Sequence, residues 1–226
     1  GIYTYKDGQI YKGSFWDGHK NGKGTLTYPN GNTFEGEWKN DLQEGYGVFT
    51  YSKGGKYEGN WKYGRENGHG TFDYPNGDYY KGDFKNGEMD GVGVYIFNNG
   101  NKYEGQWKDD QMTGQGVFIL KQGDRYQGSF TNGKLNGQGT FISLRGDIYS
   151  GQYVDGKMYG KGIFTFASGN EYIGYWKDDK MDGYGTFNFL NGDIYDGQYL
   201  KGKMNGHGIY MYKNGDKYDG HWKNDK

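Results

Sequence analysis

Residues 57–61 read Tyr-Glu-Gly-Asn-Trp, and this pattern of aromatic, glycine and aromatic residues at every second position recurs along the whole chain. Each copy begins 23 residues after the previous one, with no insertion or deletion. A fixed period of this length indicates a repeat array, in which each copy packs against its neighbours. The copies begin at Tyr11, Phe34, Tyr57, Tyr80, Tyr103, Tyr126, Tyr149, Tyr172, Tyr195 and Tyr218.

Glycine keeps the same period. One glycine stands inside each five-residue motif, and a G-x-G pair such as Gly45 and Gly47 lies between successive motifs. Glycine at a fixed place indicates a backbone requirement, either a positive φ or the close approach of another group. Because the glycine of each motif alternates with two aromatic residues on one face of the strand, we expect an aromatic ring to lie over the bare glycine backbone. Structural roles are therefore expected for Gly36, Gly59, Gly82 and Gly105.

Each copy is predicted to be a β-hairpin. In residues 22–38, apolar residues and glycine alternate with polar residues, as in a half-buried strand. Pro29-Asn30-Gly31 supplies a turn, and a short polar connection such as 39–41 follows. Because one hairpin is barely stable in water, we expect an all-β, single-layer, twisted antiparallel β-hairpin solenoid, an elongated rod. This array spans residues 1–226, and its ends fall out of phase, which predicts a segment of a longer chain.

Composition excludes several classes of protein. The low mean hydropathy of −1.10 is typical of disorder, but an aromatic content of 19% is not. The net charge is −1 with mixed charges, so no basic patch for nucleic acid is expected. The absence of cysteine excludes disulfides and fits a reducing, cytoplasmic compartment. No apolar run is long enough to predict a membrane helix, and no signal peptide is visible.

No catalytic, metal or cofactor site is predicted. His69 and His207 occupy equivalent positions six copies apart, too far to share a metal in a ribbon. Residues 22–25 read Gly-Lys-Gly-Thr, but a phosphate-binding loop needs a different glycine spacing and a following helix. We therefore expect a protein that is not an enzyme and has no cofactor.

The aromatic motif, the G-x-G pair and the 23-residue period resemble the MORN (membrane occupation and recognition nexus) repeat over essentially the whole chain. Phe34, Tyr153 and Tyr199 are mild departures from its pattern. The resemblance implies a twisted all-β solenoid that acts as a scaffold or protein-binding rod. MORN arrays occur in radial spoke heads of cilia, in cytoskeletal complexes of protist division, in junctophilins, and beside phosphatidylinositol-phosphate kinase or SET methyltransferase domains.

Two sets of residues are candidates for partner binding. A single-layer sheet has no second layer to cover its aromatic face, so part of that face is predicted to stay open as a groove; the alternative, that these residues only form the core, is compatible with it. The groove candidates are Tyr57, Trp61, Tyr103, Trp107, Tyr172 and Trp176. The second set is a methionine/lysine rib between copies, since methionine adapts to irregular partner surfaces; the alternative is that each methionine folds over its own aromatic layer. Its members are Met112, Lys134, Leu135, Lys157, Met158, Lys180, Met181 and Met204.

A third feature lies on the outward face. Apolar residues gather there in the later copies, at Ile148, Val154, Ile173 and Tyr175. Grouped exposed apolar residues indicate a contact patch, so copies 149–199 are predicted to belong to the partner side.

The function expected from these features is a non-catalytic scaffold that binds other proteins of a large cytoskeletal assembly. The favoured location is a ciliary or flagellar axoneme, especially the radial spoke head. One alternative is a membrane-linked adaptor for anionic phospholipid; the mixed charges argue against it, unless the lysine rib forms a continuous basic ridge. Another is the targeting module of an enzyme whose catalytic domain lies outside this segment. An unpaired terminal strand edge would also allow a homodimer.

Overall fold

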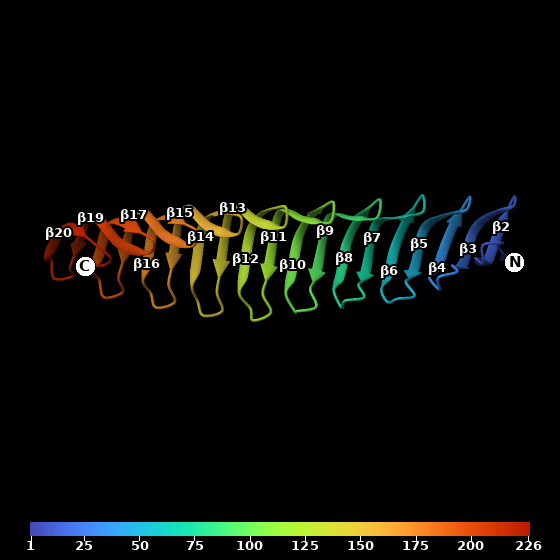
Figure 1. Cartoon of the computed structure of the whole chain (residues 1–226), viewed down its shortest axis with the longest axis horizontal. Coiled ribbons are helices and arrows are strands. Elements are labelled where there is room, and N and C mark those ends of the chain that lie inside the picture. Colours follow the sequence, from blue (N-terminus) through green and yellow to red (C-terminus); the bar gives the residue numbers. More distant parts are fainter. The chain divides into compact units, whose positions relative to one another are not determined.

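The computed structural model describes residues 1–226 as twenty β-strands with no helix, which confirms the all-β prediction. The chain divides into two compact units, residues 1–111 and 112–226. Figure 1 shows that each unit is a succession of hairpins that follow one another in sequence order.

Within each unit, every strand pairs antiparallel with its sequence neighbours. The strands that begin in the first unit are β1 (Ile2–Thr4), β2 (Ile10–Trp16), β3 (His19–Thr27), β4 (Thr33–Lys39), β5 (Leu42–Thr50), β6 (Lys56–Lys62), β7 (Arg65–Asp73), β8 (Tyr79–Lys85), β9 (Glu88–Ile96), β10 (Lys102–Lys108) and, at the unit boundary, β11 (Gln111–Ile119).

The second unit has the same meander. Its remaining strands are β12 (Arg125–Thr131), β13 (Lys134–Ile142), β14 (Ile148–Val154), β15 (Lys157–Thr165), β16 (Glu171–Lys177), β17 (Lys180–Asn188), β18 (Ile194–Leu200), β19 (Lys203–Met211) and β20 (Lys217–Trp222).

Two kinds of turn alternate along the chain. A five-residue loop joins β3 to β4, where the predicted turn lies, and the Tyr28 N–H group donates to the Asn32 carbonyl at 2.9 Å. The expected polar connection between copies is itself a tight hairpin turn: Asn40 and Asp41 join β4 to β5 with φ angles of 47° and 69°. Positive φ at both positions is the signature of a type I′ turn, whose twist matches that of paired strands.

The loops of successive copies are joined by hydrogen bonds through an Asp or Asn side chain. Asp147 Oδ1 accepts from the Ala167 N–H group at 2.9 Å, and Asn170 Oδ1 accepts from that of Leu190 at 2.8 Å. Both prolines occupy the donor position of this bond and have no N–H group. The matching acceptor position before Pro75 is Gly55, so donor and acceptor are absent together.

The glycines leave room for an aromatic ring of their own copy. A Cβ atom on Gly47 would lie 2.5 Å from Phe34 Cζ, and one on Gly36 would lie 2.6 Å from Gly47 Cα. Corresponding atoms on Gly59 and Gly82 would lie 2.5 Å from the Cα of the glycine opposite, and Gly105 lies opposite Gly93 in the β9–β10 register. A ring therefore lies over bare backbone, as expected.

The choice of tyrosine and tryptophan in the five-residue motif follows from this packing. Tyr57 is 0% exposed, and its hydroxyl donates to the Asn60 carbonyl at 2.9 Å. The Trp61 Nε1–H group donates to the Gly47 carbonyl at 3.2 Å. The Tyr57 ring meets the rings of Trp61 and Phe84, of its own and the next copy, edge to face at 5.3 and 5.0 Å. Each copy thus buries its neighbour's rings, while the polar tips of the column's tryptophans and of first-position tyrosines such as Tyr57 stay hydrogen-bonded.

Candidate functional site

The six aromatic residues predicted to line an open groove are buried. Their exposed fractions are 0% for the tyrosines and 5–6% for the tryptophans, because each tyrosine covers paired glycines and is covered in turn by the next copy. They form the core, and their predicted accessibility to a partner is wrong. The residues concerned are Tyr57, Trp61, Tyr103, Trp107, Tyr172 and Trp176.

A different aromatic series remains half-exposed. These residues lie at the end of each strand that carries a G-x-G pair, such as β5 and β7, and at the start of the loop that follows it. In the first unit the ring centroids of Phe49, Tyr51, Phe72, Tyr74 and Tyr95 follow one another at 4.6, 5.7, 4.3 and 5.7 Å. We call these five residues the first ladder.

The second unit repeats this arrangement. Centroids of Phe164, Phe166, Phe187, Phe189 and Tyr210, the second ladder, are separated by 4.5, 5.6, 4.5 and 5.6 Å. All ten ladder residues are intermediate in exposure. The five-residue motif does not include these residues. Two aromatic residues at alternate positions, as in Phe-Thr-Phe at 164–166, could have indicated them.

The methionine column lies on this same aromatic face. In strand register, Met158 is opposite Tyr153, Met181 opposite Trp176 and Met204 opposite Tyr199. Leu135 is buried and opposite Phe130, while Met112, Met158, Met181 and Met204 are intermediate in exposure.

The lysines do not share that face, which corrects the prediction of one methionine/lysine rib. Successive residues of a strand point to opposite sides of the sheet, so Lys134, Lys157, Lys180 and Lys203 are exposed on the other side. Lys134 Nζ lies 3.8 Å from an Asp155 oxygen, and Lys157 Nζ lies 3.4 Å from an Asp178 oxygen. The lysines are therefore not a basic ridge without acidic neighbours.

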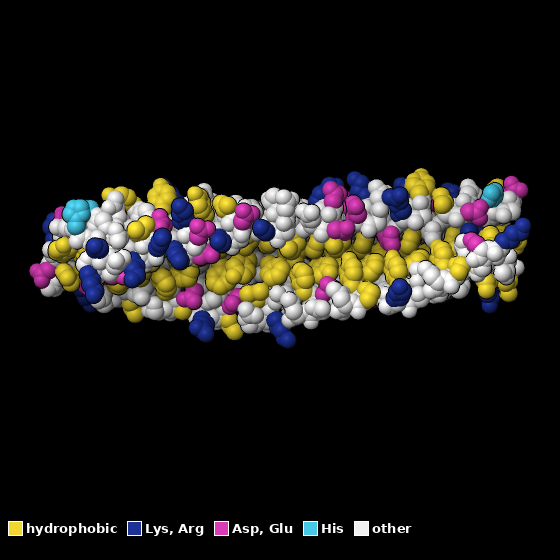
Figure 2. Space-filling view, in the orientation of Figure 1, with side chains coloured by type: hydrophobic (Ala, Val, Ile, Leu, Met, Phe, Trp, Pro, Cys, Tyr) yellow, Lys and Arg dark blue, Asp and Glu magenta, His cyan; other side chains and the backbone are white.

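In the first unit the same column is polar at Lys20, Gln43 and Glu66. Gln43 Nε2 donates to the Tyr28 hydroxyl at 3.2 Å, so the column touches the loop-side aromatic residue 15 positions earlier. Glu66 stands 15 positions after Tyr51, and burial raises the pKa of its carboxyl group. In the second unit the methionine column and the ladder together form an apolar strip. In the first unit the strip is the ladder alone, with these polar column residues beside it. Figure 2 shows hydrophobic side chains gathered in a band over β4–β9.

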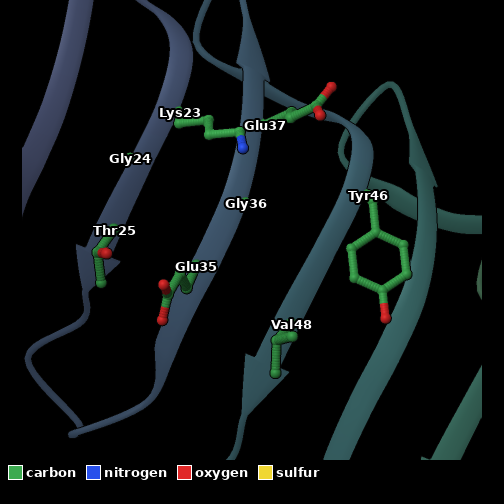
Figure 3. A pocket seen from close by; sticks show the side chains of 8 residues that line it. All are labelled: Lys23, Gly24, Thr25, Glu35, Gly36, Glu37, Tyr46 and Val48. Carbon is green, nitrogen blue, oxygen red and sulfur yellow. The ribbon is translucent and has the colours of Figure 1, made fainter.

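A second surface feature is a shallow hollow on the opposite, outward face. In the first unit it has a volume of about 430 Å³ and is crossed by β3, β4 and β5. Figure 3 shows its side chains projecting from these three strands. The lining is mostly polar and consists of Lys23, Gly24, Thr25, Glu35, Gly36, Glu37, Tyr46 and Val48.

The equivalent hollow in the second unit, six copies later, has a volume of about 490 Å³ and a mixed lining that includes two isoleucines and two tyrosines. Ile163 and Ile173 face each other in register and replace Thr25 and Glu35. Tyr175 replaces Glu37, and Lys161 Nζ lies 5.5 Å from its ring centroid. Of the outward apolar residues predicted in the later copies, Ile173 and Tyr175 line this hollow, whereas Ile148 and Val154 do not. Sequence reasoning missed Ile163 and Tyr184. Comparison of columns six copies apart would have revealed Ile163, which replaces Thr25, but not Tyr184, whose equivalent is also a tyrosine, Tyr46.

Three of the four histidines lie in exposed pairs with aspartates. His69 Nδ1 is 2.6 Å from Asp83 Oδ1, and His207 Nε2 is 3.2 Å from Asp219 Oδ1. No group of three or more His, Cys, Asp or Glu residues is placed to hold a metal ion. None of the chain forms a helix of the length and apolarity that crossing a bilayer requires.

The family model for the MORN repeat matches ten consecutive segments that together cover residues 11–147 and 149–226. The chain belongs to the MORN repeat family. Comparison with curated proteins returns no match. Membership of this family, predicted from the five-residue motif and its period, is thus confirmed. The radial spoke type stays a prediction.

Solved structures with related folds come from other proteins. The wild-type TCP10 domain of CPAP from Danio rerio aligns with 98% of this chain and 100% of its own, at a TM-score of 0.51 and 12% identity. The TCP domain of SAS-4 from Drosophila melanogaster, solved in complex with a proline-rich motif of Ana2, aligns with 69% and 85% of the two chains, at a TM-score of 0.43 and 17% identity. At such identities the first likeness concerns the fold alone.

Proposed function

We propose that this MORN-repeat chain is a non-catalytic scaffold that binds segments of other proteins along the apolar strip of each unit. The observation that carries this proposal is the ladder of half-exposed rings in each unit, continued in the second unit by the methionine column beside it. Contiguous exposed apolar surface rimmed by polar residues is typical of protein-binding sites. Aromatic and methionine side chains are also the residues enriched at such interfaces.

The outward hollow of the second unit is a further contact surface in this proposal. Ile163 and Ile173 are each 43% exposed, and Tyr184 is 59% exposed. Large apolar side chains grouped at this level of exposure lose unfavourable contact with water when a partner covers them. The hollow of the first unit has Thr25 and Glu35 in place of the two isoleucines and would gain less from being covered, so the two units would differ in the partners they bind.

The proposed setting is a cytoskeletal assembly, with the ciliary or flagellar axoneme and its radial spoke head as the favoured place. A membrane-linked adaptor is the second candidate. The aspartates beside Lys134 and Lys157 reduce the attraction of these lysines for anionic lipid. An enzyme-targeting role is the third. Fractionation of the tagged full-length protein with non-ionic detergent separates the first two: retention with the insoluble cytoskeleton supports the scaffold, and release with membranes supports the adaptor.

The binding surface itself can be tested by photo-crosslinking in the cell of origin. A photoreactive amino acid at Tyr51 or Phe189 should capture defined proteins, identified by mass spectrometry, whereas one at Lys12 should not. Lys12 is exposed in β2 beside a buried core residue and so points away from the strip. Equal capture from all three positions, or capture from none, would contradict the proposal.

A further inference from the structure

The first ladder has a regular spacing that selects for the conformation of its partner. Each copy contributes one ring pair, such as Phe49 with Tyr51 or Phe72 with Tyr74. Each copy also contributes two strands, and neighbouring strands lie about 4.8 Å apart. Equivalent rings therefore recur about every 9.6 Å, measured across the strands.

Polyproline II is the regular peptide conformation whose repeat fits this spacing. It has three residues per turn and rises about 3.1 Å per residue, so that one face recurs about every 9.3 Å. An α-helix recurs about every 5.4 Å, and one face of an extended strand recurs about every 6.8 Å. Grooves lined with aromatic rings are a known way of binding polyproline II segments, because that conformation is already ordered before binding.

Two hydroxyl groups of the ladder are free to bind a peptide backbone. The Tyr95 hydroxyl donates to Asp78 Oδ2 at 2.8 Å, but those of Tyr51 and Tyr74 make no hydrogen bond within the chain. A polyproline II segment has no internal hydrogen bonds, so its carbonyl groups are available as acceptors. Tyr51 and Tyr74 lie one copy apart and could each donate to one turn of such a segment.

Glu66 adds a charge requirement next to these rings. Its carboxylate acts on Tyr51 through its charge, which contributes, after burial, to raising the pKa of that phenol. Glu66 forms no ion pair within the chain, whereas Lys20 of the same column has Asp41 at 4.0 Å. A partly buried carboxylate without a cation is stabilised when a partner supplies one.

We propose, building on the protein-binding function above, that the first ladder binds a proline-rich segment in the polyproline II conformation, with an arginine or lysine side chain of that segment paired to Glu66. Rings at each copy pack against successive turns of the segment. Tyr51 and Tyr74 donate hydrogen bonds to its carbonyl groups. The second ladder has phenylalanine at both corresponding positions, Phe166 and Phe189, and Met181 where Glu66 stands, so it lacks the hydroxyl groups and the charge.

Fluorescence anisotropy with the full chain tests this proposal. The probe is a fluorescein-labelled oligoproline peptide with one central arginine, compared with the same peptide carrying glutamine. We expect the arginine peptide to bind more tightly, and Glu66→Gln to remove that difference. Replacing both Tyr51 and Tyr74 by alanine should weaken binding by about tenfold or more, as for hot-spot aromatics. The milder pair Tyr51→Phe with Tyr74→Phe, which keeps the rings, should weaken it by a smaller factor.

The matched control is the pair Phe166→Ala with Phe189→Ala in the second ladder, which should leave the affinity for the arginine peptide unchanged. Absence of binding, or equal loss from both ladder variants, would overturn the proposal. Its failure is distinguishable from that of the proposed function. If photo-crosslinking at Tyr51 captures partners at segments without proline, only the proline-rich inference falls; if neither strip captures a partner, both fall.

Discussion

Trp61 donates its indole N–H to the Gly47 carbonyl at 3.2 Å, and Tyr153, at the equivalent position of a later copy, has a buried hydroxyl group with no partner. The tryptophans of this column share the bond of Trp61, as at Trp107 and Trp176. Phe84 has no polar group to satisfy. Tyr199, the other tyrosine of this column, makes no hydrogen bond either, but only the Tyr153 hydroxyl is fully buried without a partner.

Replacing Tyr153 by phenylalanine should stabilise the second unit. A buried hydroxyl without a hydrogen bond costs about 1–3 kcal/mol, and its removal leaves the ring packing unchanged. We expect a gain of about 1 kcal/mol in the free energy of unfolding by urea. The control is Tyr149→Phe, which removes a hydroxyl that donates to the Gln152 carbonyl at 3.0 Å and should destabilise. Equal effects of the two variants would show that the Tyr153 hydroxyl is satisfied in solution.

The second glycine of the G-x-G pair should tolerate no side chain. A Cβ atom on Gly47 would meet the Phe34 ring at 2.5 Å, and the ring cannot retreat because it is 0% exposed. Gly47→Ala should therefore cost about 3 kcal/mol in the free energy of unfolding, at the upper end of overpacking. Gly18→Ala is the control: its φ is 76° but nothing lies within 4 Å of the added atom. Only the backbone penalty of about 1 kcal/mol applies there. A smaller loss for Gly47→Ala than for Gly18→Ala would contradict the packing account.

The period of the sequence was enough to predict the hairpin array, because every copy repeats the same alternation and the same turn residues. It could not separate core from surface among the aromatics. Tyr57 and Phe72 are both aromatic residues at strand spacing, yet Tyr57 is buried and Phe72 is half-exposed. What distinguishes them is which ring covers a glycine pair, and that depends on the register between strands. The separation of Met158 from Lys157 was predictable, since neighbouring strand residues face opposite ways.

The loop hydrogen bonds between copies should contribute measurably to stability. In Asn170→Ala the Leu190 N–H group loses its acceptor at 2.8 Å, and we expect a cost of about 1 kcal/mol in the urea unfolding of the chain. Asn170→Asp keeps an acceptor oxygen, as Asp147 and Asp193 do in equivalent positions, and should be close to neutral. Hydrogen exchange of the Leu190 amide should be faster in the alanine variant only. Equal exchange in both variants would show that this bond does not protect the loop.

The buried tyrosines should make the chain sensitive to alkali. Burial raises the pKa of Tyr103 and Tyr149 from 10.0 to about 12, so these phenols stay neutral in the folded chain at a pH that ionises them when unfolded. Their contribution to stability is therefore fully present below pH 10 and is lost as the pH rises from 10 toward 12. The urea midpoint should fall over this window, and tyrosinate absorbance should show late titration of the buried group. Tyr103→Phe with Tyr149→Phe should reduce that fall, because the same position is already phenylalanine at Phe34. A single titration of all phenols near pH 10, with the fold intact, would contradict the burial of this column.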